Sequence, residues 1–199
     1  MLIDRIRSLF DAGRRDRRIA PRRKTLLAAE VLPVASFASV KILNVSKSGC
    51  AGETAAPLQA NQPLIFSLGG NRFHQGTVRW VRGQKFGMEL DDALGILGYS
   101  DAVDPALLGS RRARPRRYPV DLDGQIVVGS PFFRATVRDV SQSGLRIEVG
   151  APLEIGQQVV IRLSDRPLIL ATVRWRAHRM LGFETAERMQ TLRLAYAGE

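Results

Sequence analysis

The sequence repeats itself at an offset of 95 residues, and this repeat constrains the fold more strongly than any other feature. Val-Ser-x-Ser-Gly at 45–49 matches 140–144, Thr-Val-Arg-Trp at 77–80 recurs at 172–175, and Gly-x-Glu at 87–89 recurs at 182–184. An arginine cluster at 17–23 matches 111–117 at an offset of 94. Since internal repeats correspond to repeated structural units, we expect two copies of one module of about 90 residues.

Each copy contains short segments in which apolar and polar residues alternate, bounded by Gly, Pro, Asp or Ser. In the second copy, for example, Phe133, Ala135 and Val137 alternate with polar residues. Such alternation is typical of half-buried antiparallel strands. The first copy has six such segments, at 27–34, 39–44, 50–54, 63–68, 73–81 and 85–90. Many short strands in so small a module favour closure, which leaves no exposed edge, so we predict an all-β fold of two tandem six-stranded antiparallel β-barrels.

Short helices are expected only at the flanks of the modules. Residues 1–13 are predicted to form an N-terminal amphipathic helix, and the first module is predicted to span 14–92. A linker at 93–107 is expected to hold a helical turn near 93–97. The second module is predicted to span 108–199 and to end in a helix over 184–197, where apolar residues recur at helical spacing.

The formal net charge of +11 is concentrated in two places. Residues 1–24 carry a net +6 and residues 111–117 a net +5, so the rest of the chain is neutral overall. A protein that binds a nucleic acid or an anionic membrane spreads its cations over a face. Two clusters indicate two small anion sites instead, although a single arginine run is more often a solvated linker. Binding to RNA or DNA through a basic β-barrel is therefore kept only as an alternative.

Several other classes of function are not expected. No apolar run of about 18 residues is present, and the N-terminus lacks the pattern of a secretory signal, so we expect a cytoplasmic protein without membrane insertion. The only cysteine is Cys50, and neither His74 nor His178 lies at a spacing from it that is usual for zinc ligands, so no zinc site is expected. Because no nucleophile–base pair or paired-carboxylate motif is visible, we expect neither an enzyme nor a metal or cofactor.

Both copies also share a polar constellation. Each has two arginines at i and i+4, followed by an acceptor-x-Ser-x-x-Gly turn: Arg18, Arg22, Asn44, Ser46 and Gly49, then Arg112, Arg116, Asp139, Ser141 and Gly144. Guanidinium groups bind phosphates and guanine edges in a fork, and an Asx oxygen accepts from guanine donors. The turn alone would be an ordinary β-turn signal, with Gly supplying a positive φ. Its retention beside the arginines in both copies favours a ligand with phosphates and guanines.

The repeated Thr-Val-Arg-Trp segment has a simpler interpretation. Val and Trp stand at alternate positions, so we expect Val78, Trp80 and Trp175 in the barrel core and Arg79 and Arg174 in solvent. With both tryptophans in the core, the chain would lack the aromatic surface on which small barrels stack bases.

Taken together, the Arg-x-x-x-Arg and (Asp/Asn)-x-Ser-x-x-Gly motifs, with the later Val-x-Trp and Gly-x-Glu segments, resemble PilZ domains, the bacterial receptors for cyclic di-GMP. The resemblance covers roughly residues 14–92 and 108–188. It implies a six-stranded barrel with an external cyclic di-GMP site. By position, the implied ligand-binding residues are Arg17, Arg18, Arg22, Asn44, Ser46 and Gly49 in the first copy, and Arg111, Arg112, Arg116, Asp139, Ser141 and Gly144 in the second, which fits the pattern better.

The resemblance predicts a non-catalytic receptor that contains no cofactor and signals to a protein partner. Ligand binding to the arginine cluster between the modules would change their relative orientation. An alternative is a degenerate PilZ adaptor that acts by protein–protein interaction and has lost one or both ligand sites, the first copy being the first to lose its site.

Overall fold

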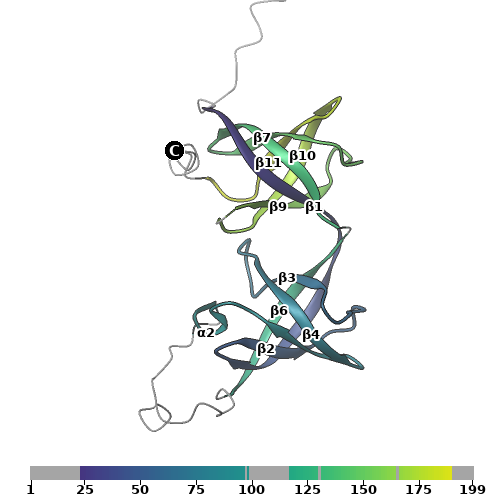
Figure 1. The fold of residues 1–199 in the computed structure, drawn as a ribbon, viewed down its shortest axis with the longest axis vertical. Helices are drawn as coiled ribbons and strands as arrows, with labels where there is room; N and C mark the ends of the chain where they lie inside the picture. The colour runs from purple at the N-terminus through teal and green to yellow at the C-terminus, as the bar shows by residue number, and fades with distance from the viewer. Residues whose placement is uncertain (1–22, 97, 99–116, 130, 165, 190–199) are drawn as a thin grey trace, which may run out of the picture.

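The computed structural model describes residues 23–96, 98, 117–129, 131–164 and 166–189. These residues form two lobes stacked along the long axis of the molecule (Figure 1). The N-lobe contains the second half of β1 (Arg23–Ser46) together with β2 (Gly49–Glu53), β3 (Pro63–Ser67), β4 (His74–Arg82), β5 (Lys85–Glu89) and β6 (Tyr118–Gly129). The C-lobe contains the first half of β1 together with β7 (Phe133–Ser141), β8 (Gly144–Val149), β9 (Gln158–Leu163), β10 (Ile169–Ala177) and β11 (Met180–Thr185).

All named strands belong to one eleven-stranded antiparallel sheet, in the order β2-β5-β4-β3-β6-β1-β7-β8-β11-β10-β9. The strands at both ends of this order, β2 and β9, also pair with β1. The predicted all-β antiparallel class is therefore confirmed. The prediction of two separate six-stranded barrels needs correction, because the sheet is continuous through β1.

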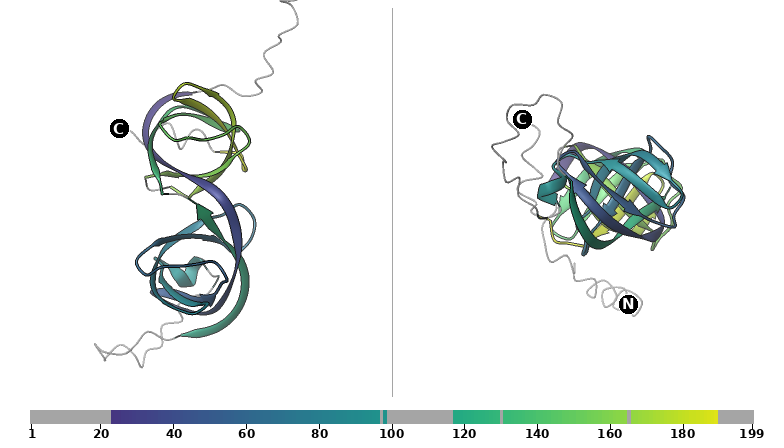
Figure 2. Two further views of the ribbon diagram at one scale, coloured as in Figure 1. Left: turned by 90° about the vertical axis from the view of Figure 1, so that its right-hand side faces the viewer. Right: turned by 90° about the horizontal axis from the view of Figure 1, so that it is seen from below.

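Strand β1 is continuous because its middle lacks the glycine, asparagine or aspartate that a two-residue hairpin turn requires. Two strands were predicted at 27–34 and 39–44, but the intervening Ala35-Ser36-Phe37-Ala38 contains no Gly, Asn or Asp to form a tight turn. The backbone instead stays extended, with register irregularities at Val34–Ser36 and Ile42–Asn44. One 24-residue strand therefore passes from the C-lobe to the N-lobe (Figure 2).

The two repeats exchange their first strands. The first half of β1 pairs with β7, where Ala29 is opposite Ala135, and with β9, where Val31 is opposite Ile161. The corresponding strand of the second repeat, β6, pairs instead with the second half of β1, where Gly124 is opposite Val40, and with β3. Each lobe thus consists of five strand segments from one repeat and one strand from the other. The two lobes therefore do not coincide with the two sequence repeats.

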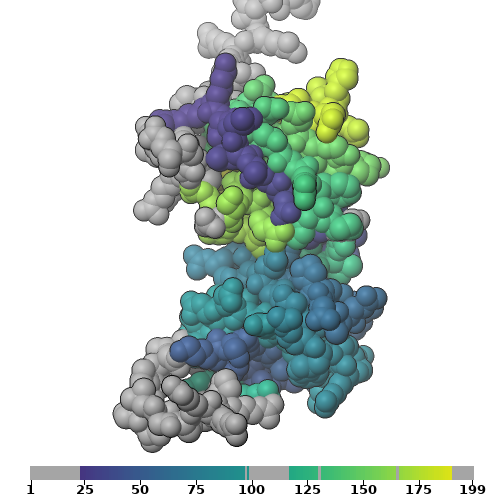
Figure 3. Space-filling view, viewed as in Figure 1, coloured from purple at the N-terminus to yellow at the C-terminus, as the bar shows by residue number. Residues whose placement is uncertain are grey.

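Three hydrophobic cores hold this arrangement together. One fills the C-lobe around Ile147 and Leu181, and a second fills the N-lobe around Phe66 and Phe86. The third lies between the lobes and comprises Leu32, Val34, Ile65, Phe73, Val127 and Val160. In the space-filling view the C-lobe rests directly on the N-lobe (Figure 3). Because apolar burial stabilises contact, this third core holds the two lobes in one orientation.

The helical predictions have mixed outcomes. The expected turn near 93–97 is present as α2 (Ala93–Ile96), which buries Ala93 and Leu94 and is capped by Asp92, whose Oδ1 accepts from the Gly95 amide. At the C-terminus, β11 continues to Thr185 and residues 186–189 are not helical, so the beginning of the helix predicted at 184–197 is wrong. Its remainder and the N-terminal segment 1–13 lie outside the described residues. Within the described part of the chain, no helix has the length and apolarity to span a membrane.

Candidate functional site

The two acceptor-x-Ser-x-x-Gly segments form matching hairpins at the outer ends of the lobes. Ser46 is opposite Gly49 at the β1–β2 turn, and Ser141 is opposite Gly144 at the β7–β8 turn. In both hairpins the serine hydroxyl donates to the glycine carbonyl over 3.2 Å. Each hydroxyl therefore donates its hydrogen bond within the hairpin. Its oxygen can still accept a hydrogen bond from a ligand.

The glycine of each motif is required by a close approach of neighbouring backbone. A Cβ at Gly49 would lie 2.0 Å from the Met88 carbonyl oxygen, and one at Gly144 would lie 2.2 Å from the Phe183 carbonyl oxygen. Gly49 also has a φ of +154°, whereas Gly144 has no positive φ. The expectation that a positive φ explains both glycines is therefore incomplete, and the shared reason is that the backbone of the paired neighbouring strand, β5 or β11, lies too close for a Cβ.

The tryptophans lie outside the core, contrary to the prediction. Val78 and Val173 are fully buried as expected, but Trp80 is 38% exposed and Trp175 is half-buried. The register is irregular between Val78 and Trp80, and likewise between Val173 and Trp175. An extra residue in a strand reverses the face to which the next side chain points, so a bulge turns both indoles outward.

Each indole lies against a glycine on the adjacent strand. A Cβ at Gly87 would be 2.1 Å from Nε1 of Trp80, and one at Gly182 would be 1.9 Å from Nε1 of Trp175. The repeated glycine of the Gly-x-Glu motif thus leaves space for the ring. Sequence reasoning missed the two tryptophans as candidate functional residues. A signal was present, because each tryptophan and its contacting glycine both recur at the offset of 95 residues.

The remaining residues of these motifs form exposed ion pairs. Nε of Arg79 donates to Oε2 of Glu89 over 2.6 Å, and Arg174 makes the same contact with Glu184. Both arginines face solvent as predicted. Because Arg79 and Arg174 are partly neutralised, they contribute less to anion attraction than an unpaired arginine would.

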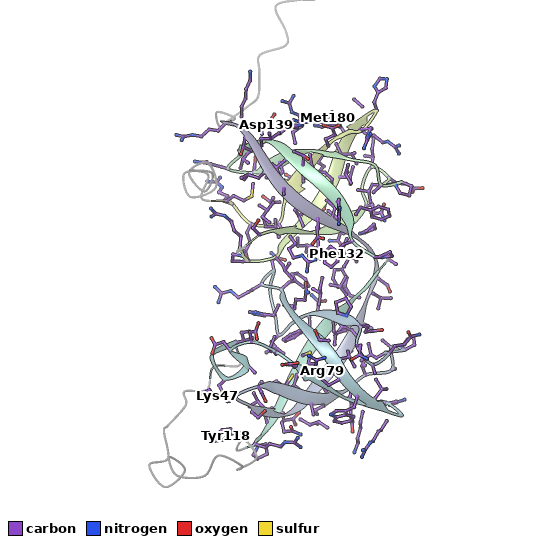
Figure 4. All side chains as sticks on the ribbon, viewed as in Figure 1. Lys47, Arg79, Tyr118, Phe132, Asp139 and Met180 are labelled. Atoms are coloured by element: carbon purple, nitrogen blue, oxygen red, sulfur yellow. The ribbon has the colours of Figure 1, made fainter. Side chains whose placement is uncertain are left out.

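These elements line two similar pockets. The N-lobe pocket has a volume of about 260 Å³, and its lining includes Asn44, Ser46, Gly49, Arg79, Trp80 and Arg117. The C-lobe pocket has a volume of about 250 Å³, and its lining includes Ser141, Ser143, Gly144, Arg174, Trp175 and Glu184. Figure 4 shows Lys47 and Tyr118 near the outer end of the N-lobe and Asp139 near the outer end of the C-lobe. The two pockets are therefore separate sites at opposite ends of the molecule.

The acceptor residue differs between the two pockets. Asp139 is buried, and its Oδ2 lies 2.5 Å from Nε of Arg146 on the neighbouring strand. The angle of this approach does not meet hydrogen-bond geometry, so the contact is an ion pair. In the N-lobe the corresponding pair is Asn44 opposite Ala51, and Asn44 lines the pocket. Asp139 is thus engaged within the protein, whereas Asn44 faces the space that a ligand would occupy.

The predicted arginines Arg17, Arg18, Arg22, Arg111, Arg112 and Arg116 lie outside the described residues. Their nearest described neighbours show where the chain enters each lobe. Arg117 lines the N-lobe pocket. Arg23 is opposite Val140 in the C-lobe, one residue before Ser141. Both arginine clusters are therefore covalently attached to strands that begin beside a motif turn.

The described residues allow thiol and metal chemistry at the pockets to be assessed. Burial raises the pKa of the Cys50 thiol, beside the N-lobe pocket, to about 12, so the thiol stays protonated and is a poor nucleophile. No group of three potential metal ligands occurs in the described part of the chain. The pockets offer hydrogen-bond acceptors, an aromatic face and guanidinium groups, which suit non-covalent binding of an aromatic anion.

Comparison with known proteins adds one relationship to this description. No curated protein and no solved structure matches the chain. One protein-family model does match, and the matched segment covers most of the second sequence repeat, including β6 in the N-lobe and β7–β11 in the C-lobe. Residues 110–195 match the family model of the PilZ domain.

Proposed function

We propose that this protein is a non-catalytic receptor for cyclic di-GMP, with one site at the outer end of each lobe. The observation that carries the proposal is the N-lobe pocket, where Asn44, Ser46, Trp80 and Arg117 line one space. The PilZ match of residues 110–195 supports the same class of ligand.

The chemistry of the pocket fits a cyclic dinucleotide. Cyclic di-GMP presents two anionic phosphates and two flat guanines, and Arg117 can bind a phosphate oxygen through its planar fork. Trp80 is 38% exposed, with the guanidinium carbon of Arg82 5.8 Å from its ring centroid, and its indole would stack on a guanine beside that cation. Asn44 and Ser46 supply acceptors for the guanine N–H groups. In the C-lobe pocket, Ser141 and Trp175 would take the roles of Ser46 and Trp80.

The predicted arginines would complete the two sites. Arg116 and Arg112 precede Arg117 in the chain, and Arg22, Arg18 and Arg17 precede Arg23. We propose that they supply the further guanidinium groups that two phosphates require. Arg111 would assist as the neighbour of Arg112.

We propose that a protein partner reads the ligand at the outer ends of the lobes. The sequence-based expectation of a change in lobe orientation would require the third core to open. This would expose six buried apolar side chains, and each costs about 1.5–3 kcal/mol when fully exposed. Contacts formed around the ligand itself carry the signal without that penalty.

The two tryptophans also favour a second candidate, single-stranded nucleic acid. Trp80, which is exposed, and Trp175, which is half-buried, are aromatic side chains of the kind on which bases stack. They lie at opposite ends of the molecule, however, and each is set in a separate pocket. A small dinucleotide fits two separate pockets better than a continuous strand does.

Isothermal titration calorimetry of the full chain with cyclic di-GMP tests the proposal. We expect two binding events per chain, and loss of one event in Arg112→Ala/Arg116→Ala. Arg72→Ala, which removes an exposed arginine outside both pockets, is the matched control and should bind as wild type. Absence of binding to the wild-type chain would contradict the proposal and favour the adaptor alternative. Salt-sensitive binding of single-stranded RNA without competition by cyclic di-GMP would favour the nucleic-acid alternative.

A further inference from the structure

The strand exchange brings residues of different repeats to the same pocket. Strand β6 of the second repeat runs along β1, with Tyr118 opposite Val45, so Arg117 reaches the Ser46–Gly49 turn of the first repeat. In the C-lobe, Lys24 of the first repeat is opposite Asp139, and Arg23 is opposite Val140. Both entry points place the start of one repeat beside the motif turn of the other.

We propose that each ligand site is shared between the two repeats. The basic residues of the second repeat serve the turn and tryptophan of the first, through Arg117 with Ser46 and Trp80. Those of the first repeat serve the second, through Arg23 and Lys24 beside the Ser141 turn and Trp175. This inference rests on the proposed function for the identity of the ligand, whereas the exchange itself is independent of it.

A steric difference between the two first strands specifies the exchange. Ala29 and Gly124 are equivalent positions of the two repeats, 95 residues apart. Their cross-strand partners, Ala135 and Val40, are also 95 residues apart. A Cβ at Gly124 would lie 2.6 Å from the Ser67 carbonyl oxygen. If each repeat kept its own first strand, Ala29 would place its Cβ there. The N-lobe therefore accepts the strand that carries glycine.

Charge pairing specifies the same choice. Glu30 accepts from Nε of Arg162 over 2.6 Å in the C-lobe. Gln125 is at the equivalent position of β6, opposite the buried Ser67. Returning each strand to its own repeat would leave Arg162 without a carboxylate and place Glu30 beside a buried serine, which is unfavourable.

A second ion pair across the repeats lies at the surface. Nζ of Lys41 is 2.8 Å from Oδ1 of Asp121, and this contact raises the pKa of Lys41. The equivalent of Asp121 in the first repeat is Leu26, which carries no charge. Although exposed pairs are weak, this one again favours β6 over the first half of β1 in the N-lobe.

Engineered cysteines test the exchange without any ligand. Ala28 and Thr136 are opposite each other across β1 and β7, and both are accessible to solvent. In a Cys50→Ala background, Ala28→Cys/Thr136→Cys should form a disulfide within one chain under mild oxidation. The matched control is Asp123→Cys/Thr136→Cys, because Asp123 is the equivalent of Ala28 but is opposite Lys41. A disulfide in the control pair, or one joining two chains, would overturn the intrachain exchange.

The two tryptophans allow each ligand site to be read separately. Trp175→Phe leaves Trp80 as reporter of the N-lobe pocket, and Trp80→Phe leaves Trp175 as reporter of the C-lobe pocket. With cyclic di-GMP as probe, Arg117→Ala should weaken the affinity reported by Trp80 by about 10- to 100-fold, the usual effect of removing a charged hydrogen bond. The affinity reported by Trp175 should stay within about 2-fold. Arg23→Ala/Lys24→Ala should give the reverse.

The outcomes separate this inference from the function on which it rests. If Arg117→Ala weakened the affinity reported by Trp175 and spared that reported by Trp80, site sharing would be wrong while the receptor function stood. If neither tryptophan responded and calorimetry showed no binding, the proposed ligand would be wrong even where the Ala28–Thr136 disulfide had formed.

Discussion

Arg162 donates a hydrogen bond from Nη1 to Oε1 of Gln75 over 2.8 Å and thereby joins strand β9 of the C-lobe to strand β4 of the N-lobe. The same guanidinium binds Glu30 through Nε and lies 4.2 Å from the ring centroid of Phe132. One side chain thus connects both lobes beside the third core. This contact adds to the third core, which packs the two lobes against each other.

Replacement of Arg162 by alanine should therefore loosen the contact between the lobes. We expect the free energy of unfolding to fall by about 1–2 kcal/mol, since a charged hydrogen-bond network is lost from a partly exposed position. Urea denaturation measures this change. The control is Lys85→Ala, which removes an exposed ion pair between Nζ of Lys85 and Oε1 of Glu53, 3.4 Å apart. This control should lower the free energy of unfolding by less than about 0.5 kcal/mol. Equal losses in the two variants would contradict a special role for Arg162.

Gly87→Ala should displace the indole of Trp80, because the new Cβ would lie 2.1 Å from Nε1. We expect a red shift of the Trp80 emission in a Trp175→Phe background and weaker ligand binding in the N-lobe. The free energy of unfolding should fall by about 1–3 kcal/mol through overpacking. Gly150→Ala is the control, since its Cβ would meet only the end of the Arg179 side chain at 3.7 Å. An unchanged emission spectrum in Gly87→Ala would show that the ring does not depend on this glycine.

His74 should make the N-lobe less stable in mild acid. Burial, with a smaller effect of the nearby Arg72 charge, lowers the pKa of His74 below its usual 6.5. The folded protein then binds fewer protons than the unfolded chain, so the stability that His74 contributes is complete above pH 6.5 and falls as the pH drops below it. Chemical denaturation at several pH values measures this effect. As the pH is lowered from 7.5 to 5.5, we expect the free energy of unfolding to fall less for His74→Gln than for the wild-type protein. Identical pH profiles for the two proteins would disprove this.

Cys50 should not react with thiol reagents in the folded protein. Its side chain is buried in the N-lobe, and burial raises the pKa of the thiol to about 12, so almost no thiolate exists at neutral pH. We expect Ellman's reagent to label Cys50 at pH 8 only after denaturant is added, at a rate that follows unfolding. Rapid labelling of the native protein would mean that the β1–β2 hairpin opens without global unfolding.

Several elements of this fold could be predicted from local sequence. Alternating residues correctly indicated strands such as β7 and β8, and the repeat correctly predicted that both motif turns are hairpins of one kind. The same reasoning failed at Trp80 and Trp175, because alternation assumes an unbroken pleat and a bulge precedes each ring. The assignment of Asp139 to a ligand stays a prediction, and the structure adds what a sequence cannot show, that Arg146 lies beside its carboxylate.

The sequence by itself determined the strand content, the two matching turns and the position of the basic clusters at the start of each repeat. Only the tertiary structure decided which lobe each first strand joins. The physical reason is that alternation specifies the buried face of a strand but not its partner. Here the partner depends on contacts between distant residues, namely the space that only Gly124 leaves beside Ser67 and the carboxylate that Glu30 offers to Arg162.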